Sequence, residues 1–386
     1  MAKEKQSWMK RIAAGLVAMS MMAMTAGCGG GDKAAENKSG AGTAKLGVIG
    51  YMTGAGAAYG ESIRQGLELA RDEINAEGKV KIELVFEDSK GEKNEAINAA
   101  NKLIHKDNVL AILGPTLSSE MFAIGPMVNQ EGVPIMGTSL TVEGITEIGD
   151  YVFRNSLPES AAIPQSIKRA KAKYNFKKVA IMYSDNNDLA VSGYKTIQQT
   201  LKEESVEVLD VETFSDKNTD FSAQLTKIST MNPDAIMVAG LYQEAALILK
   251  KAREIGINVP VIGNNGFNSP QLIKSAGAAA DGAIVASPWF PGKDDPKVKK
   301  FIADYKAKYN KEPDQFAAQA YDALKIMAIA IEKSGSTTDR NKLRDQLKAV
   351  KDYDGVTGKF AFDAKRNPAM DVNVLIVKDG KFTELK

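Results

Sequence analysis

The sequence contains one cysteine, one histidine and almost no surplus of charge, and each shortage excludes a class of function. Because Cys28 has no second cysteine as a partner, a disulfide framework and a cysteine-based zinc site are excluded. His105 alone cannot form a histidine cluster, so we expect no metal and no cofactor. The 50 Lys and Arg residues nearly balance the 48 Asp and Glu residues, which leaves no basic surplus for a nucleic-acid partner. These shortages favour a protein that is not an enzyme.

The first 43 residues have the composition of a secretion signal followed by a tether. Basic residues precede an apolar run at residues 12–24, which is shorter than the roughly 20 residues of a membrane span. Two small residues then precede Cys28, and this arrangement resembles the lipobox of bacterial lipoproteins, whose cysteine carries the lipid anchor. We therefore expect a lipoprotein signal peptide at residues 1–27, lipidation of Cys28 and a flexible tether at residues 28–43. An ordinary signal peptide with an incidental cysteine is the alternative.

From residue 45 onward, short runs rich in β-branched residues alternate with longer helical patterns. Apolar strands separated by helices predict an α/β fold with parallel sheets covered on both faces. In such sheets the ligand crevice lies outside the carboxyl ends of the strands. The expected strands are residues 46–50, 80–86, 109–113, 133–136, 179–183, 206–211, 235–238, 259–262 and 282–286. The expected helices include residues 61–76, 92–105, 192–204, 221–229 and 244–255.

The alternation of strands and helices is interrupted at residues 151–156 and again at residues 288–291. A chain of 386 residues is longer than one hydrophobic core usually serves, so the interruptions predict two α/β lobes joined by a hinge. Toward the end of the chain, residues 357–363 and 372–377 predict extended segments, and the pair at 379–380 (Asp-Gly) predicts a hairpin turn.

A glycine-rich loop after the first strand invites a dinucleotide-binding interpretation. Gly54, Gly56 and Gly60 open a helix, but the third glycine of a G-x-G-x-x-G motif would fall at Tyr59, so the spacing fails by one. An NAD-dependent dehydrogenase is therefore a less favoured alternative, with Asp88 as the acid that would bind the ribose. A glycine-rich loop at a helix N-terminus also suits any small anion.

Hydroxyl side chains follow the third and fourth expected strands. Ser118 lies where a helix starts, and it can either cap that helix or present its hydroxyl to a ligand carboxylate. Ser139 and Thr141 form a second hydroxyl cluster, although turn residues alone would explain it equally well.

Motifs along most of the chain resemble the type I periplasmic binding proteins that serve branched-chain amino-acid ABC importers. The resemblance implies two Rossmann-like lobes with three crossings: residues 44–157 and 288–364 in one lobe, and 158–287 and 365–386 in the other. The motifs are residues 45–60 (KLGVIGYMTGAGAAYG), 112–120 (ILGPTLSSE), 132–141 (GVPIMGTSLT), 179–188 (VAIMYSDNND) and 320–323 (AYDA).

The resemblance also implies a set of ligand-binding residues. In the first lobe these are Tyr59, Ser118 for the ligand carboxylate, and Ser139 with Thr141 for carboxylate and ammonium. In the second lobe the matches are weaker. An aromatic residue of the family corresponds to Leu241, next to Tyr242, and the acid that pairs the ammonium corresponds to Asn265. If the ligand has an amine, Asp188 is the first candidate for its counter-charge.

The resulting expectation is an extracytoplasmic, membrane-anchored lipoprotein that binds an amino acid, branched-chain or related, and delivers it to an ABC permease. A small carboxylate without an α-ammonium, such as an aromatic acid, is the alternative ligand. A sensory ligand-binding domain is a further alternative. Such a domain is usually connected to a transmembrane helix and a signalling module, and the sequence shows no pattern typical of either.

Overall fold

The structure is a computed structural model that describes residues 42–386, so the expected signal peptide, Cys28 and nearly all of the tether lie outside the described residues. The first sheet has the order β2-β1-β3-β4-β5, and all neighbouring strands are parallel. We call the part of the chain built on this sheet the first lobe. Its strands are β1 (Thr43–Gly50), β2 (Lys81–Asp88), β3 (Ala111–Leu113), β4 (Ile135–Gly137) and β5 (Val152–Arg154).

Helices connect these strands, as the sequence pattern predicts for parallel pairs. The helices are α1 (Ala57–Glu77), α2 (Lys93–Asn101), which continues into a π-helical turn at Lys102–Lys106, and α3 (Ser118–Gln130). His105 is exposed on that turn.

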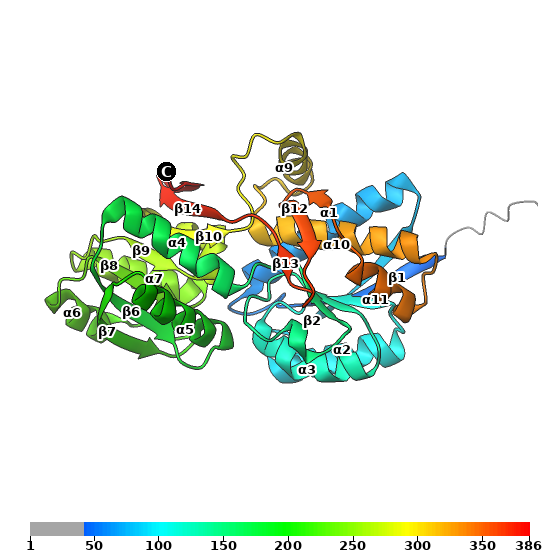
Figure 1. Ribbon diagram of the computed structural model, residues 1–386, viewed down its shortest axis with the longest axis horizontal. Helices are drawn as coiled ribbons and strands as arrows, with labels where there is room; N and C mark the ends of the chain where they lie inside the picture. The colour runs from blue at the N-terminus through cyan, green and yellow to red at the C-terminus, as the bar shows by residue number, and fades with distance from the viewer. Residues whose placement is uncertain (1–41) are drawn as a thin grey trace, which may run out of the picture. The chain divides into compact units, whose positions relative to one another are not determined.

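The second sheet has the order β15-β14-β10-β9-β8-β6-β7, and we call the part built on it the second lobe (Figure 1). Strands β7, β6, β8, β9 and β10 are parallel, whereas β14 and β15 are antiparallel additions at one edge. The strands are β6 (Lys178–Ser184), β7 (Glu207–Phe214), β8 (Ala235–Ala239), β9 (Val261–Gly263), β10 (Ala283–Ser287), β14 (Asn373–Lys378) and β15 (Lys381–Glu384). The helices are α4 (Glu159–Tyr174), α5 (Asp188–Glu203), α6 (Ser222–Thr230), α7 (Tyr242–Glu254) and α8 (Pro270–Ala276), with 3-10 turns at Asn265–Asn268 and Gly277–Ala280.

The chain returns to the first lobe after β10. Helix α10 packs along α1, and the contact is so close that a Cβ on Gly66 would lie 2.1 Å from the Ala317 carbonyl oxygen. Only glycine permits this approach of two backbones. The elements of this part are α9 (Pro296–Tyr309), α10 (Gln315–Ser334), α11 (Arg340–Lys348) and a small antiparallel sheet of β11 (Tyr353–Gly355), β12 (Gly358–Phe362) and β13 (Pro368–Ala369).

The chain therefore passes between the two sheets three times: after β5, after β10 and after β13. The lobe boundaries predicted from the sequence remain predictions. The pairing of the strands gives information on the last of these boundaries. Because β13 pairs with β12 and β14 pairs with β10, the third passage lies between residues 369 and 373, later than the expected 364. The predicted hairpin turn at residues 379–380 joins β14 and β15 and is confirmed.

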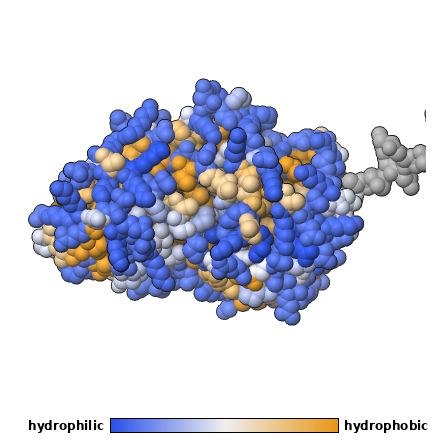
Figure 2. All heavy atoms as spheres, in the orientation of Figure 1, coloured by the Kyte–Doolittle hydropathy of each residue, from blue (hydrophilic) through white to orange (hydrophobic). Residues whose placement is uncertain are grey.

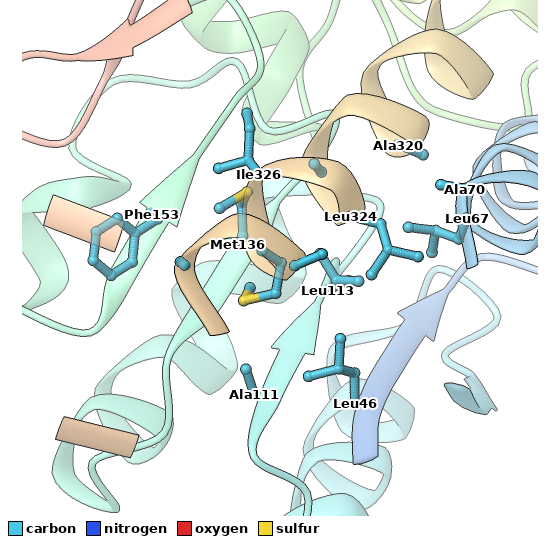
Figure 3. Close-up of a cluster of buried hydrophobic side chains, with 14 of the residues drawn as sticks. Leu46, Leu67, Ala70, Ala111, Leu113, Met136, Phe153, Ala320, Leu324 and Ile326 are labelled. Atoms are coloured by element: carbon cyan, nitrogen blue, oxygen red, sulfur yellow. The ribbon is translucent and has the colours of Figure 1, made fainter. Parts of the chain in front are cut away.

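The core of the first lobe lies between its sheet and helices α1 and α10. Figure 3 shows side chains of β1, β3 and β4 pointing toward Leu67 and Ala70 of α1 and Leu324 and Ile326 of α10. A second cluster, which includes Ile49 and Ile112, covers the opposite face of the same sheet. Burial on both faces explains why the strands read as continuous apolar runs. The visible surface is mainly hydrophilic, with hydrophobic residues in small patches (Figure 2).

Candidate functional site

Loops from the carboxyl ends of both parallel sheets surround a cavity of about 480 Å³. In the first lobe the lining loops follow β1, β2 and β3 and include Tyr51, Lys93 and Ser119. In the second lobe they follow β6, β7 and β8 and include Asp188 and Lys217. Because ligands of parallel α/β sheets bind at these strand ends, the cleft between the lobes is the candidate site.

Two ion pairs join the lobes at this cavity. The Lys93 ammonium lies 3.6 Å from the Asp188 carboxylate, and the Lys217 ammonium lies 3.6 Å from the Glu92 carboxylate. Each lobe contributes one lysine and one acid to these two pairs. The Asp188 side chain is 45% exposed, so water screens its charge, and such surface pairs stabilise a structure by at most about 1 kcal/mol. The structure therefore places Asp188 on the rim of the cavity, opposite a lysine.

Ser118 is the first residue of α3 and is buried. The helix start is not capped by this serine, because Glu120 reaches back and accepts a 2.8 Å hydrogen bond from the Leu117 amide. Within residues 42–386 the Ser118 hydroxyl takes part in no hydrogen bond. Burial raises the pKa of Glu120 to about 7, and the nearby carboxylates of Asp88 and Glu92 add to this shift. The Ser118 hydroxyl is thus available to a ligand at the carboxyl end of β3.

Ser139 and Thr141 lie in the extended segment after β4, and both are buried. The Ser139 hydroxyl donates to the Thr116 carbonyl at 2.6 Å, which ties this segment to the loop that precedes Ser118. The Thr141 hydroxyl points the other way and donates to the Glu159 carboxyl at 3.3 Å. The structure therefore brings the predicted hydroxyl positions of the first lobe into adjoining loops.

Glu159 is a buried acid that the sequence analysis did not identify. It is the first residue of α4, directly after the first passage between the sheets, and its exposed fraction is 0%. Its Oε1 accepts hydrogen bonds from the Thr141 hydroxyl at 3.3 Å and from the Asn265 amide at 3.2 Å. Its Oε2 is also buried and has no hydrogen-bond partner among the described residues. Burial raises the pKa of Glu159 to about 7.

Asn265, at the position where the resemblance implies an acid, uses its side chain for other contacts. Its Oδ1 accepts from the Gln315 side-chain amide at 2.6 Å and from the Asn268 side-chain amide at 3.2 Å. Gln315 is the first residue of α10, so Asn265 ties the second lobe to the first. An oxygen that already accepts two hydrogen bonds has little capacity left for a ligand amine.

Tyr59 and Tyr242 form a second contact between the lobes. The Tyr59 hydroxyl donates to the Gly266 carbonyl at 2.9 Å and accepts from the Tyr242 amide at 3.0 Å. Its ring packs edge-on against Tyr242 at 5.1 Å and against Phe316 at 4.9 Å. Burial raises the pKa of Tyr59, so the phenol stays protonated. The aromatic contact thus adjoins Asn265 on one side and the start of α10 on the other.

The glycine-rich loop has a structural explanation. Gly54, Gly56 and Gly91 surround the Tyr51 ring, and a Cβ on Gly56 would lie 2.3 Å from a ring carbon. Between them the Ala55 carbonyl accepts hydrogen bonds from the Tyr242 hydroxyl, at 2.8 Å, and from the Gln243 side-chain amide. This loop therefore holds the second lobe, which accounts for its glycines without a dinucleotide.

The contacts described above place the predicted residues in three positions. Thr141 and Asn265 meet at Glu159, Tyr59 and Tyr242 meet beside them, and Asp188 lies on the rim. Glu159, Gln315 and Phe316 were not predicted. The one sequence signal for Glu159 was an acid next to a proline at a lobe crossing. Gln315 and Phe316 begin α10, which lies more than 150 residues further along the chain.

The described residues also lack two other kinds of feature. Residues 42–386 contain no group of three or more His, Cys, Asp and Glu side chains that could hold a metal ion. In the same part of the chain, no helix combines the length and the apolar character needed to cross a membrane.

Comparison with known proteins identifies the family. A leucine-, isoleucine-, valine-, threonine- and alanine-binding protein of Pseudomonas aeruginosa is 27% identical over 327 residues, which covers 84% of this chain and 86% of that protein. Among solved structures, the branched-chain amino acid transporter substrate binding protein LivJ from Streptococcus pneumoniae, in complex with isoleucine, is 34% identical with a TM-score of 0.83. That match covers 88% of this chain and 98% of the other.

A solute binding protein of an ABC transporter from Rhodopseudomonas palustris, in complex with 3,4-dihydroxybenzoic acid, is 25% identical with a TM-score of 0.79 and covers 89% of this chain and 95% of that one. The fold is therefore that of the type I periplasmic binding proteins, as expected from the sequence. The family model described as "Periplasmic binding protein" matches residues 43–381. This chain belongs to the periplasmic binding protein family.

Proposed function

We propose that this chain is the extracytoplasmic solute-binding lipoprotein of an ABC importer. It captures an amino acid, branched-chain or related, in the cleft between its lobes and delivers it to the permease without catalysing a reaction. Relatives whose names specify leucine, isoleucine and valine support this ligand class.

The observation that carries the proposal is the continuous set of contacts where the carboxyl ends of the two sheets meet. It runs from Tyr242 through Tyr59 to the loop at Asn265, and from there through Glu159 to Thr141. These groups come from both lobes and from α4, which follows a crossing. A ligand held among them therefore touches both lobes only when the cleft is closed.

Closure of the lobes is the proposed mechanism. A ligand shifts the equilibrium toward the closed form by the difference between its affinities for the closed and open forms. The permease then distinguishes loaded from empty protein by the relative positions of the lobes. Lipidation of Cys28 and the tether at residues 28–43 would keep the protein near the membrane that holds the permease.

One observation favours a second candidate ligand, a small carboxylate without an ammonium group. Asn265 supplies no negative charge at the position where the resemblance implies an acid, and one structural relative was solved with 3,4-dihydroxybenzoic acid. A dehydrogenase is less well supported, because the glycine-rich loop is used in the contact between the lobes.

Thermal unfolding of the purified protein tests the proposed function. The protein is heated with each of the common L-amino acids, with benzoate and 3,4-dihydroxybenzoate, and with NAD. A ligand at 100 times its dissociation constant stabilises the folded state by about 2.7 kcal/mol, a shift that is easily measured. We expect stabilisation by branched-chain amino acids. Stabilisation by NAD alone, or by no amino acid and no carboxylate, would contradict the proposal.

A further inference from the structure

The buried carboxyl of Glu159 has more hydrogen-bonding capacity than the surrounding protein uses. Two donors reach Oε1, from Thr141 and Asn265, whereas Oε2 is buried with no partner among residues 42–386. A carboxylate has about four acceptor positions, so at least the two on Oε2 remain open. Buried polar atoms without partners are rare, and each one calls for a physical explanation, such as a bound group that completes its hydrogen bonds.

Among residues 42–386, no positive charge stands beside this acid. The one charged side chain of that part that affects it through space is Glu143, an exposed carboxylate that disfavours ionisation further. A buried carboxylate without a counter-charge is costly, which explains why burial raises the pKa of Glu159 to about 7. A cation placed beside Oε2 would remove this cost.

The other two side chains considered for a ligand amine are less suitable. The Asn265 side-chain oxygen already accepts from Gln315 and Asn268, and an amide has no charge. Asp188 faces Lys93 across the cavity and is 45% exposed, so its charge is both paired and hydrated. Glu159 alone among the three combines a negative charge, full burial and an open acceptor oxygen.

We propose that Glu159 pairs with the ammonium group of the ligand, with Thr141 and Asn265 holding its other oxygen in place. This inference rests on the solute-binding function proposed above and narrows the ligand class to α-amino acids. Binding energy then depends on the amine, because a ligand without it leaves the buried Oε2 unpartnered in the closed cleft.

A purely structural role for Glu159 is the competing explanation. In that case the acid stays protonated and only links Thr141 of the first lobe to Asn265 of the second. A glutamine would accept the same two hydrogen bonds through its oxygen, so it would preserve that link. The Glu159→Gln variant therefore distinguishes a purely structural link between the lobes from a counter-charge for the ligand.

The experiment measures calorimetric affinities of L-leucine and of its deaminated analogue, 4-methylpentanoate, for wild type, Glu159→Gln and Glu143→Gln. Truncating one partner of a buried charge pair typically costs 2–5 kcal/mol, so we expect Glu159→Gln to bind leucine about 30-fold more weakly or worse. Glu143→Gln removes the same charge from an exposed position nearby, where that charge disfavours ionisation of Glu159, so the affinity should stay the same or rise slightly. If leucine does not bind wild type, the most stabilising amino acid of the thermal panel replaces it, with its own deaminated analogue.

Proton release provides a measurement on the wild type, which does not depend on a variant that folds. Binding of an ammonium to a carboxyl that is half protonated near pH 7 must release protons, so the binding enthalpy will vary with the ionisation enthalpy of the buffer. We expect release in wild type and none in Glu159→Gln.

The outcomes are distinguishable. Tight amino-acid binding that survives Glu159→Gln, or that releases no protons, overturns the role of Glu159 and leaves the proposed function intact. Tighter binding of the deaminated analogue than of the amino acid overturns the ligand class. Absence of binding by every amino acid and carboxylate overturns the proposed function and this inference together.

Discussion

Replacing Tyr59 with phenylalanine tests whether the contact between the lobes controls affinity. The hydroxyl donates to the Gly266 carbonyl at 2.9 Å and accepts from the Tyr242 amide at 3.0 Å, and the ring is 3% exposed. Tyr59→Phe keeps the packing against Phe316 but leaves a buried acceptor and a buried donor without partners. Each such group costs about 1–3 kcal/mol, so the closed form should become less stable by about 2 kcal/mol or more. When the lobes separate, water can reach both groups, so the open form loses much less.

The expected result is a loss of affinity without an equal loss of stability. If closure is required for binding, the apparent dissociation constant rises with the closing equilibrium, here by about 30-fold. Calorimetric titration measures the affinity, and thermal unfolding without ligand measures the stability. Tyr194→Phe is the matched control, because the Tyr194 ring stacks on Tyr183 at 4.1 Å within the second lobe. An affinity of Tyr59→Phe within twofold of wild type would refute the reasoning.

Four further results are expected. Cys28→Ser should release the protein from membranes, measured by fractionation and mass spectrometry, and unchanged retention would contradict lipidation. Ser118→Ala should weaken ligand binding by about 1–3 kcal/mol in a calorimetric titration, since the lost hydrogen bond to a ligand carboxylate is charge-assisted. Gly66→Ala should lower the free energy of unfolding by about 1–3 kcal/mol or more, because the new Cβ would lie 2.1 Å from the Ala317 carbonyl oxygen. The shift of the urea midpoint measures this loss. Wild type should lose stability relative to Glu120→Gln as pH rises from about 4.5 to 7, because the folded state keeps a proton on this acid up to about pH 7 that the unfolded state loses near pH 4.5. Equal urea curves across that range would contradict this expectation.

Much of the fold could be predicted because it depends on local patterns. Strands buried on both faces read as apolar runs, so each parallel strand except β5 was found within a few residues of its position in the structure. The turn residues at 379–380 were sufficient to predict the hairpin of β14 and β15. The third crossing is hard to place from the sequence because β13 is a two-residue strand with no pattern of its own.

The site was less predictable because its groups come together only in the folded chain. Ser118, Ser139 and Thr141 follow strands and could be found from that position alone. Glu159 follows a lobe crossing, where no strand end marks it, and Gln315 begins a helix that was not among those expected. Asn265 left two alternatives open, an acid elsewhere or a ligand without an amine, and the acid proposed here, Glu159, was found only in the three-dimensional structure.

The position of Glu159 has a consequence for how closure and binding are coupled. Its Oε1 already links Thr141 of the first lobe to Asn265 of the second, so the groups that would hold the ammonium also join the lobes. Glu159 begins α4, which packs against α5, β9 and β10 of the second lobe, so Glu159 and Asn265 belong to the same lobe. The hydrogen bond that spans the two lobes is therefore the one from the Thr141 hydroxyl. The amine would then bind first to this acid of the second lobe, and closure would bring the Thr141 hydroxyl of the first lobe onto the same carboxyl. In this arrangement the ligand charge favours closure directly, because an ionised Glu159 accepts the Thr141 hydrogen bond more strongly than a protonated one.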